Sequence, residues 1–130
     1  MAAPAVIEPV IQKFEGDCAI ACLSMILALP YSEVSVVANS FVSGANKKGL
    51  GTRDIKKIAH KLGHDLQAAG PKGLDLGEET GILLVKPRGE PEHAVVLFQG
   101  VLLDPINGWV WDVDAYLGEK KAAVLRLLRV

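Results

Sequence analysis

The chain lacks a marked excess of charge of either sign. Fourteen Lys and Arg residues are matched by fifteen Asp and Glu residues, which gives a formal net charge of −1. A sequence-independent hold on nucleic acid requires a clustered basic face. We see no such face, because the basic runs are short pairs of the kind found on solvated surfaces. No nucleic-acid partner is therefore expected.

Long apolar runs are also missing. The most apolar stretch, Cys18 to Pro30, is shorter than the roughly 20 residues that a membrane-spanning helix needs. The first residues contain neither a basic start nor a sustained apolar block, so they do not resemble a secretory signal. We therefore expect no membrane span and a cytoplasmic location.

Cysteine is scarce, with Cys18 and Cys22 as the two examples. Two cysteines do not make a disulfide framework, and in a cytoplasmic protein they indicate catalytic chemistry, a metal site or core packing. Apolar residues are plentiful, since 50% of the 130 residues are hydrophobic. That share is enough to bury one core, and we predict a single domain over residues 1–130.

The first half of the chain has the pattern of helices. Three are predicted, each beginning at a polar residue that can accept hydrogen bonds from free first-turn amides. They run from Cys18 to Leu29 after Asp17, from Ser32 to about Val42, and from Arg53 to Leu62 after Thr52, with Gly63 as the stop. The first is apolar on nearly every side, which predicts a central, buried helix.

The second half has the pattern of strands separated by short turns. Strands are predicted over residues 81–85, 93–98, 101–103, 109–111 and 122–130, with a short helix over 113–117. Short connections favour antiparallel pairing of neighbours. Helices followed by strands predict the α+β class.

Four residues are candidates for chemistry. Cys18 directly follows a predicted helix cap, and the positive end of a helix favours the reactive thiolate. Cys22, one turn further on, is interpreted as core packing. His93 opens an apolar strand, and Asp104 directly follows the next predicted strand. Together with Cys18 they supply a nucleophile, its base and an orienting carboxylate. Gln12 has an amide that can donate to an oxyanion beside the Cys18 backbone N–H.

This combination resembles the papain-like cysteine peptidases of the bacteriocin-processing, double-glycine leader type. The resemblance is carried by residues 12–26 (QKFEGDCAIACLSMI), 92–97 (EHAVVL) and 104–108 (DPING), and it extends to residues 50–63 and to the strand at 81–85. It implies a papain-like fold, with the cysteine on a buried central helix and the histidine and aspartate on a mostly antiparallel sheet.

The resemblance also implies roles for the four residues. It makes Cys18 the nucleophile, His93 the general base and acid, Asp104 the residue that orients His93, and Gln12 the oxyanion donor. A peptide or protein is the implied substrate, and the mechanism needs no metal or organic cofactor. Ala19 stands where family members commonly have glycine.

Several alternatives stay open at the level of sequence. Asp112 or Asp114 could take the orienting role of Asp104. The protein could be a binding module that keeps the peptidase fold without catalysis. A zinc site could also be drawn from two Cys-x-x-x-Cys and His-x-x-x-His pairs, although their separation is far longer than in a compact finger; the four residues are Cys18, Cys22, His60 and His64.

Overall fold

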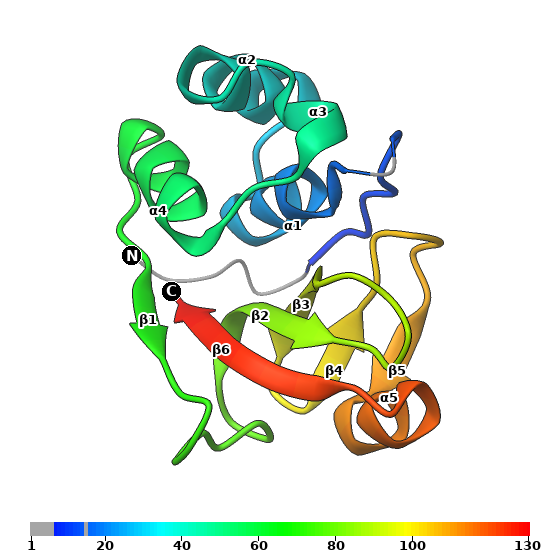
Figure 1. Ribbon diagram of the computed structural model, residues 1–130. Helices are drawn as coiled ribbons and strands as arrows, with labels where there is room; N and C mark the ends of the chain where they lie inside the picture. The colour runs from blue at the N-terminus through cyan, green and yellow to red at the C-terminus, as the bar shows by residue number, and fades with distance from the viewer. Residues whose placement is uncertain (1–6, 15) are drawn as a thin grey trace.

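A computed structural model describes residues 7–14 and 16–130 of the chain. Helices come first and a six-stranded antiparallel sheet follows, with one helix between its last two strands, which confirms the α+β class (Figure 1). The helices are α1 (Cys18–Leu27), α2 (Tyr31–Phe41), α3 (Ala45–Lys48), α4 (Thr52–Lys61) and α5 (Val113–Lys120). The strands are β1 (Gln67–Ala69), β2 (Thr80–Lys86), β3 (His93–Phe98), β4 (Val101–Leu103), β5 (Val110–Asp112) and β6 (Ala123–Arg129).

The strand order of the sheet is β1-β6-β2-β3-β4-β5, and all pairs are antiparallel. The run from β2 to β5 pairs neighbours in sequence, as the short turns predicted. β6 instead returns across the sheet to pair with β2 and β1. β1 was not predicted, because its three residues have no clear alternation and pair only with the distant β6.

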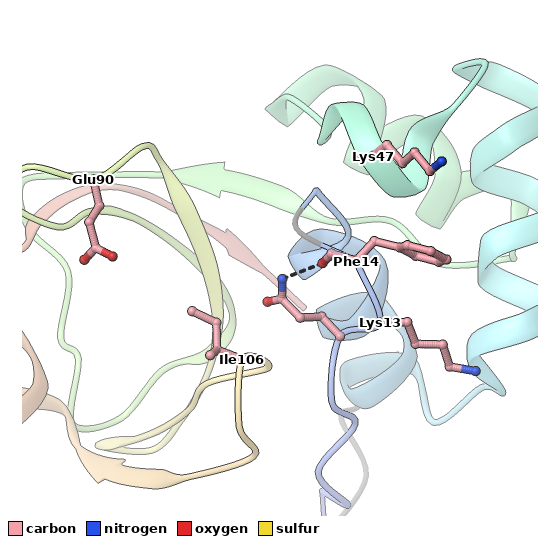
Figure 2. Close-up of a pocket in the computed structure, with 6 residues that line it drawn as sticks. Lys13, Phe14, Lys47, Glu90 and Ile106 are labelled. Carbon is pink, nitrogen blue, oxygen red and sulfur yellow. Dashed lines mark hydrogen bonds between the residues drawn. The ribbon is translucent and has the colours of Figure 1, made fainter.

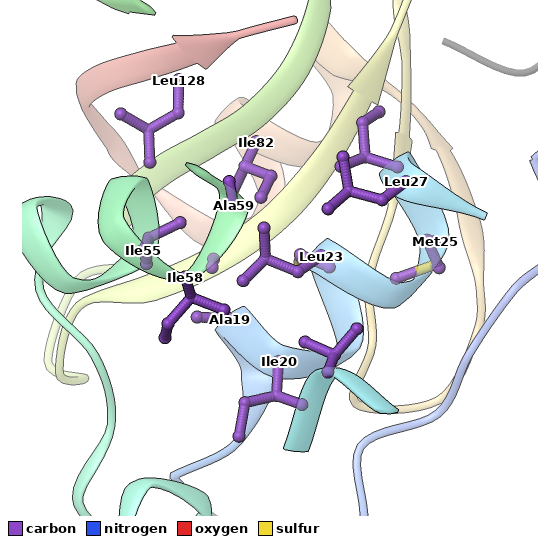
Figure 3. Close-up of a cluster of buried hydrophobic side chains, with 14 of the residues drawn as sticks. Ala19, Ile20, Leu23, Met25, Leu27, Ile55, Ile58, Ala59, Ile82 and Leu128 are labelled. Atoms are coloured by element: carbon purple, nitrogen blue, oxygen red, sulfur yellow. The ribbon is translucent and has the colours of Figure 1, made fainter. Parts of the chain in front are cut away.

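Two apolar clusters cover the two faces of the sheet. α1 is buried along almost its whole length and packs between the other helices and the sheet, as predicted (Figures 1 and 3). The side chains of β3 alternate, so that Ala94 and Val96 join the helical cluster while Val95 and Leu97 join the cluster on the other face. That second cluster includes Val113 and Tyr116 of α5, which seals the far face of the sheet.

The helices begin at or next to the predicted positions, but the predicted side-chain caps are not formed. Asp17 does precede α1, but its side chain accepts no hydrogen bond from the first turn. α2 begins at Tyr31, so Ser32 lies inside its first turn and the predicted cap is wrong. α4 begins at Thr52 itself, after Gly51, and the hydroxyl of Thr52 instead accepts a hydrogen bond from Arg126 at 2.6 Å.

The first, second and fourth helices end one or two residues before their predicted ends, at Leu27, Phe41 and Lys61. Gly63 follows α4 with φ +90°, a left-handed conformation that glycine adopts without strain. The longest helix of the described residues is α2, with 11 residues. None of the helices in residues 7–14 and 16–130 is long and apolar enough to cross a membrane.

Candidate active site

His93 and Asp104 meet across the β3–β4 hairpin. The pair Val96–Leu103 fixes the register, and one further step would set Asp104 opposite Val95, two residues from His93 along the same strand. Such diagonal neighbours lie within reach of long side chains. His93 Nε2 and Asp104 Oδ1 are accordingly 2.8 Å apart.

The turn between the two strands makes this register possible. Gln99 and Gly100 both have positive φ, at 47° and 87°, which is the two-residue hairpin turn that matches strand twist. Beyond β4, the backbone N–H of Asp104 donates to the Trp109 carbonyl at 3.1 Å, and Asp104 Oδ1 also accepts from the Ile106 N–H at 3.0 Å. The carboxylate is therefore held from both sides.

Cys18 reaches the same place from the helical half of the chain. It is the first residue of α1, is partly exposed, and lies close enough to His93 to raise the pKa of the imidazole. Because Asp104 occupies Nε2 of the imidazole, Nδ1 is the ring nitrogen available to Cys18. The predicted nucleophile, base and orienting carboxylate are thus brought together.

The electrostatics favour a charged imidazole. Burial alone would lower the pKa of His93, but its hydrogen bonds and the negative charges of Asp104 and the Cys18 thiolate outweigh burial and raise this pKa to about 9. Burial would raise the pKa of Asp104, yet the hydrogen bonds from His93 and the Ile106 N–H, with nearby positive charge, hold it below its usual range. His93 and Asp104 form an ion pair with side chains 12% and 7% exposed.

Asp17 explains why the start of α1 stays open. Its buried carboxylate turns away from the helix and accepts hydrogen bonds from the backbone N–H groups of Lys13 at 2.8 Å and Phe14 at 3.1 Å. It also accepts one from the Tyr31 hydroxyl at 2.6 Å. The first amides of α1 are therefore not capped by Asp17, and amides in that position can bind an anion.

Gln12 lies beside this centre, in a neighbouring cavity. The cavity has a volume of about 860 Å³ and is bordered by Lys13, Phe14 and Lys47 on one side and by Glu90 and Ile106 across from them (Figure 2). The Gln12 side-chain amide donates to the Phe14 carbonyl at 2.8 Å, and the Gln12 backbone N–H donates to the Pro105 carbonyl at 2.7 Å. The second bond ties Gln12 to the residue that follows Asp104.

Cys18 and His93 line a cleft of about 540 Å³. The residues that line it include Ala19, the small residue after Cys18, and Leu84. One wall is formed by residues 47–52, between α3 and α4, and the other by residues 91–94 at the start of β3. Lys47 borders both this cleft and the Gln12 cavity, so the two hollows adjoin.

The remaining predicted candidates have other partners. Asp112 caps α5 by accepting a hydrogen bond from the Ala115 N–H at 3.1 Å, which favours Asp104 as the residue that orients His93. Cys22 is fully buried in α1, and burial, followed by the charges of Cys18 and Asp104, raises the pKa of its thiol.

The structure does not assemble the zinc pattern. His60 of α4 pairs with Asp65 at 2.7 Å, and both side chains are 78% exposed. Within residues 7–14 and 16–130, no three His, Cys, Asp or Glu side chains are grouped so that they could hold a metal ion.

Basic residues that are scattered in the sequence gather along one helix. Helix α4 aligns four cationic side chains along a separate cavity of about 570 Å³, namely Arg53, Lys56, Lys57 and Lys61. Residues three and four apart share a helix face, so basic pairs that are short in sequence become one basic face. Charge runs alone therefore underestimate the clustering.

Sequence reasoning missed the network that connects α1 to the cleft wall. The Tyr31 hydroxyl, which donates to Asp17, accepts a hydrogen bond from Asn46 Nδ2 at 2.8 Å, and Asn46 precedes Lys47. Burial and the bond to Asp17 raise the pKa of Tyr31 to about 12. No local pattern links residues 17, 31 and 46, and the one available signal was the glycine-rich segment at 49–51.

Comparisons with protein-family models, with curated proteins and with solved structures find no match to this chain.

Proposed function

We propose that the protein is a cysteine peptidase of papain-like fold that cleaves a peptide or protein in the cytoplasm. The observation that carries the proposal is the convergence of three residues far apart in the chain. Cys18 at an uncapped helix start lines the same cleft as His93 and interacts electrostatically with its imidazole, and His93 is 2.8 Å from Asp104. A nucleophile, a base and the group that orients the base are what acyl transfer from a peptide needs.

The first half of the proposed reaction forms a thioester. The Cys18 thiolate attacks the scissile carbonyl carbon, and the carbonyl oxygen takes the negative charge. The Cys18 backbone N–H stabilises this oxyanion, with the Gln12 amide as second donor. The His93 imidazolium then gives its proton to the amine nitrogen as the C–N bond breaks.

The second half releases the acid. Neutral His93 removes a proton from water, and the resulting hydroxide attacks the thioester carbonyl. The C–S bond breaks, the Cys18 thiolate is restored, and the peptide leaves as a carboxylic acid. Asp104 keeps the imidazole oriented and stabilises its charged form throughout.

A binding module without catalysis is the second candidate. It is favoured by one observation, that the Gln12 amide donates to the Phe14 carbonyl and that Gln12 borders the neighbouring cavity, outside the lining of the Cys18 cleft. For catalysis, the Gln12 amide nitrogen must reach the oxyanion from its position in the neighbouring cavity.

Alkylation by iodoacetamide between pH 4 and 9 separates the two candidates without a known substrate. The peptidase proposal expects rapid modification of Cys18 near pH 6, where a free thiol with a pKa of about 8.5 reacts slowly. His93→Ala should remove most of this rate, by about 100-fold. Buried Cys22, followed in the same mass spectra, serves as the internal control. Slow alkylation of Cys18 that is the same in both proteins would favour the binding module.

A further inference from the structure

The wall of the Cys18 cleft is rich in positive charge. Lys47 and Lys48, the last two residues of α3, line it together with Arg126 of β6. Among the lining residues that the structure describes, Glu92 is the only carboxylate. Within residues 7–14 and 16–130, none of the three cations has a carboxylate within ion-pair distance. The cleft therefore offers cationic groups that the described part of the chain does not neutralise.

The backbone that carries the two lysines is fixed relative to the nucleophile. Gly16, two residues before Cys18, lies so close that an added Cβ would be 2.3 Å from the Lys47 carbonyl oxygen and 2.9 Å from the Gly49 nitrogen. Such contacts leave no room for any side chain at Gly16, so the two segments are packed backbone against backbone.

Hydrogen bonds tie the same wall down at two further points. Asp17, Tyr31 and Asn46 form a chain with bonds of 2.6 and 2.8 Å, which ends one residue before Lys47. Arg126 Nη1 donates to Thr52 Oγ1 at 2.6 Å, at the other end of the wall. Because the supports are in place before a ligand arrives, less ordering free energy is lost when an anion binds.

We propose that the cleft selects substrates that carry a carboxylate beside the scissile carbonyl, with Lys47, Lys48 and Arg126 as the specificity-determining residues. This inference rests on the proposed peptidase function. An acidic side chain and a free C-terminal carboxylate offer the same chemistry to the wall. Exposed charges at cleft distances are each worth a two- to threefold effect on the rate, so three together should give roughly tenfold at low salt.

Two alkylating reagents test the charge preference directly. Iodoacetate is anionic and iodoacetamide is a neutral analogue of similar size, so the ratio of their rates at Cys18 reports the charge of the cleft. The triple variant Lys47→Gln, Lys48→Gln, Arg126→Gln should lower this ratio about tenfold at pH 7 and low salt, and added salt should lower it in the wild type. All three side chains are exposed, so the variant should fold.

The basic face of α4 provides a matched control. The triple variant Lys56→Gln, Lys57→Gln, Lys61→Gln removes the same charge from residues that line a different cavity, so the ratio should stay within about twofold of wild type. Arg126→Lys, which keeps the charge, should also keep most of the ratio. An unchanged ratio in the cleft variant, or an equal fall in the α4 variant, would overturn the proposal.

The two proposals fail in different ways. If Cys18 is not activated, iodoacetamide reacts slowly and His93→Ala has no effect, yet the ratio of the two reagents still reports the charge of the cleft. If Cys18 is activated, pairs of peptides separate the two carboxylate sources. One pair has Glu or Gln beside the cleaved bond, and the other has a C-terminal acid or its amide. Cleavage that favours neither acidic member would also contradict the carboxylate proposal.

Discussion

Cys18 and Cys22 are one turn apart on the same helix, but their surroundings are opposite. Cys18 is partly exposed, begins α1 and lines the same cleft as His93. Cys22 is wholly buried in the apolar cluster between the helices and the sheet, where burial raises the pKa of its thiol. A thiolate at Cys18 would lie at the uncapped start of α1 and near the His93 imidazole, whereas a thiolate at Cys22 would be uncompensated.

The difference shows that a position on α1 does not by itself decide the surroundings of a thiol. The distinguishing groups come from β3 and from the turn after β4, about eighty residues further along the chain. Changes in those groups should therefore alter Cys18 much more than Cys22, whose pKa is raised first of all by burial.

Gln12→Ala should lower peptide turnover roughly 100- to 1000-fold, the usual cost of losing one oxyanion donor. Alkylation of Cys18 by iodoacetamide should be unchanged, because that reaction forms no oxyanion. The measurement is kcat on a peptide found by library screening, beside the alkylation rate. Lys13→Gln, a change in the same cavity, is the control. Equal losses in turnover and alkylation would show that Gln12 acts by supporting Cys18 and not as a donor.

Stability should depend on pH through His93. Its pKa is raised from 6.5 to about 9 in the folded chain, so the folded state binds the extra proton between these values. The stabilisation is complete below pH 6.5 and is lost as the pH rises through 9, by at most about 3 kcal/mol. Asp104, with a lowered pKa, loses its contribution in the opposite direction, as the pH falls below 3.8.

Urea unfolding at pH 6 and pH 9, in wild type and His93→Gln, measures this dependence. The free energy of unfolding of the wild type should fall over that interval, and the variant should show a flatter profile. The same slope in both proteins would remove His93 as the source. Burial raises the pKa of the Cys22 thiol, so Cys22 also loses stabilisation as its unfolded thiol ionises near pH 9, but this loss is the same in wild type and variant and cancels in the comparison.

The sheet half of this site follows from local sequence, and the helical half does not. β3 and β4 have the bounds that were predicted, because alternating apolar residues and a two-residue turn specify a hairpin locally. That hairpin register alone brings His93 to Asp104. β1 was missed because its partner is β6, at the other end of the chain.

The capping role of Asp17 was wrong for a related reason. The local pattern of an aspartate before an apolar run predicts a cap, but the Tyr31 hydroxyl and two upstream amides compete for the same carboxylate. The cleft wall was equally out of reach, since Lys47 and Arg126 are neighbours of Cys18 only in the folded chain. The residue types in the sequence suggested a cysteine-based site, but the hydrogen bonds of Asp17 and the residues around Cys18 depend on tertiary contacts.

Asp104→Asn sharpens the comparison at the base. Asparagine keeps an oxygen for His93 but removes the negative charge, so the pKa of His93 should fall by about one to two units from its value of about 9. NMR titration of the His93 ring measures this shift, and alkylation of Cys18 at pH 6 should be slower than in the wild type, because the imidazolium that stabilises the thiolate is weakened. Asp112→Asn, which alters the cap of α5, is the matched control and should leave the pKa of His93 unchanged. A pKa of His93 that does not move in Asp104→Asn would show that the charge of Asp104 does not contribute to the raised pKa.

The smallest effect is expected at Cys22. Cys22→Ala removes one buried sulfur from the helical cluster and should lower the free energy of unfolding by about 1 kcal/mol. Cys22→Ser should cost more, because its hydroxyl would enter an apolar environment. In both variants, Cys18 should be alkylated within about twofold of the wild-type rate at pH 6. A large change at Cys18 together with intact stability would mean that the two thiols share one electrostatic environment, and the contrast between the first and second turns of α1 would then be lost.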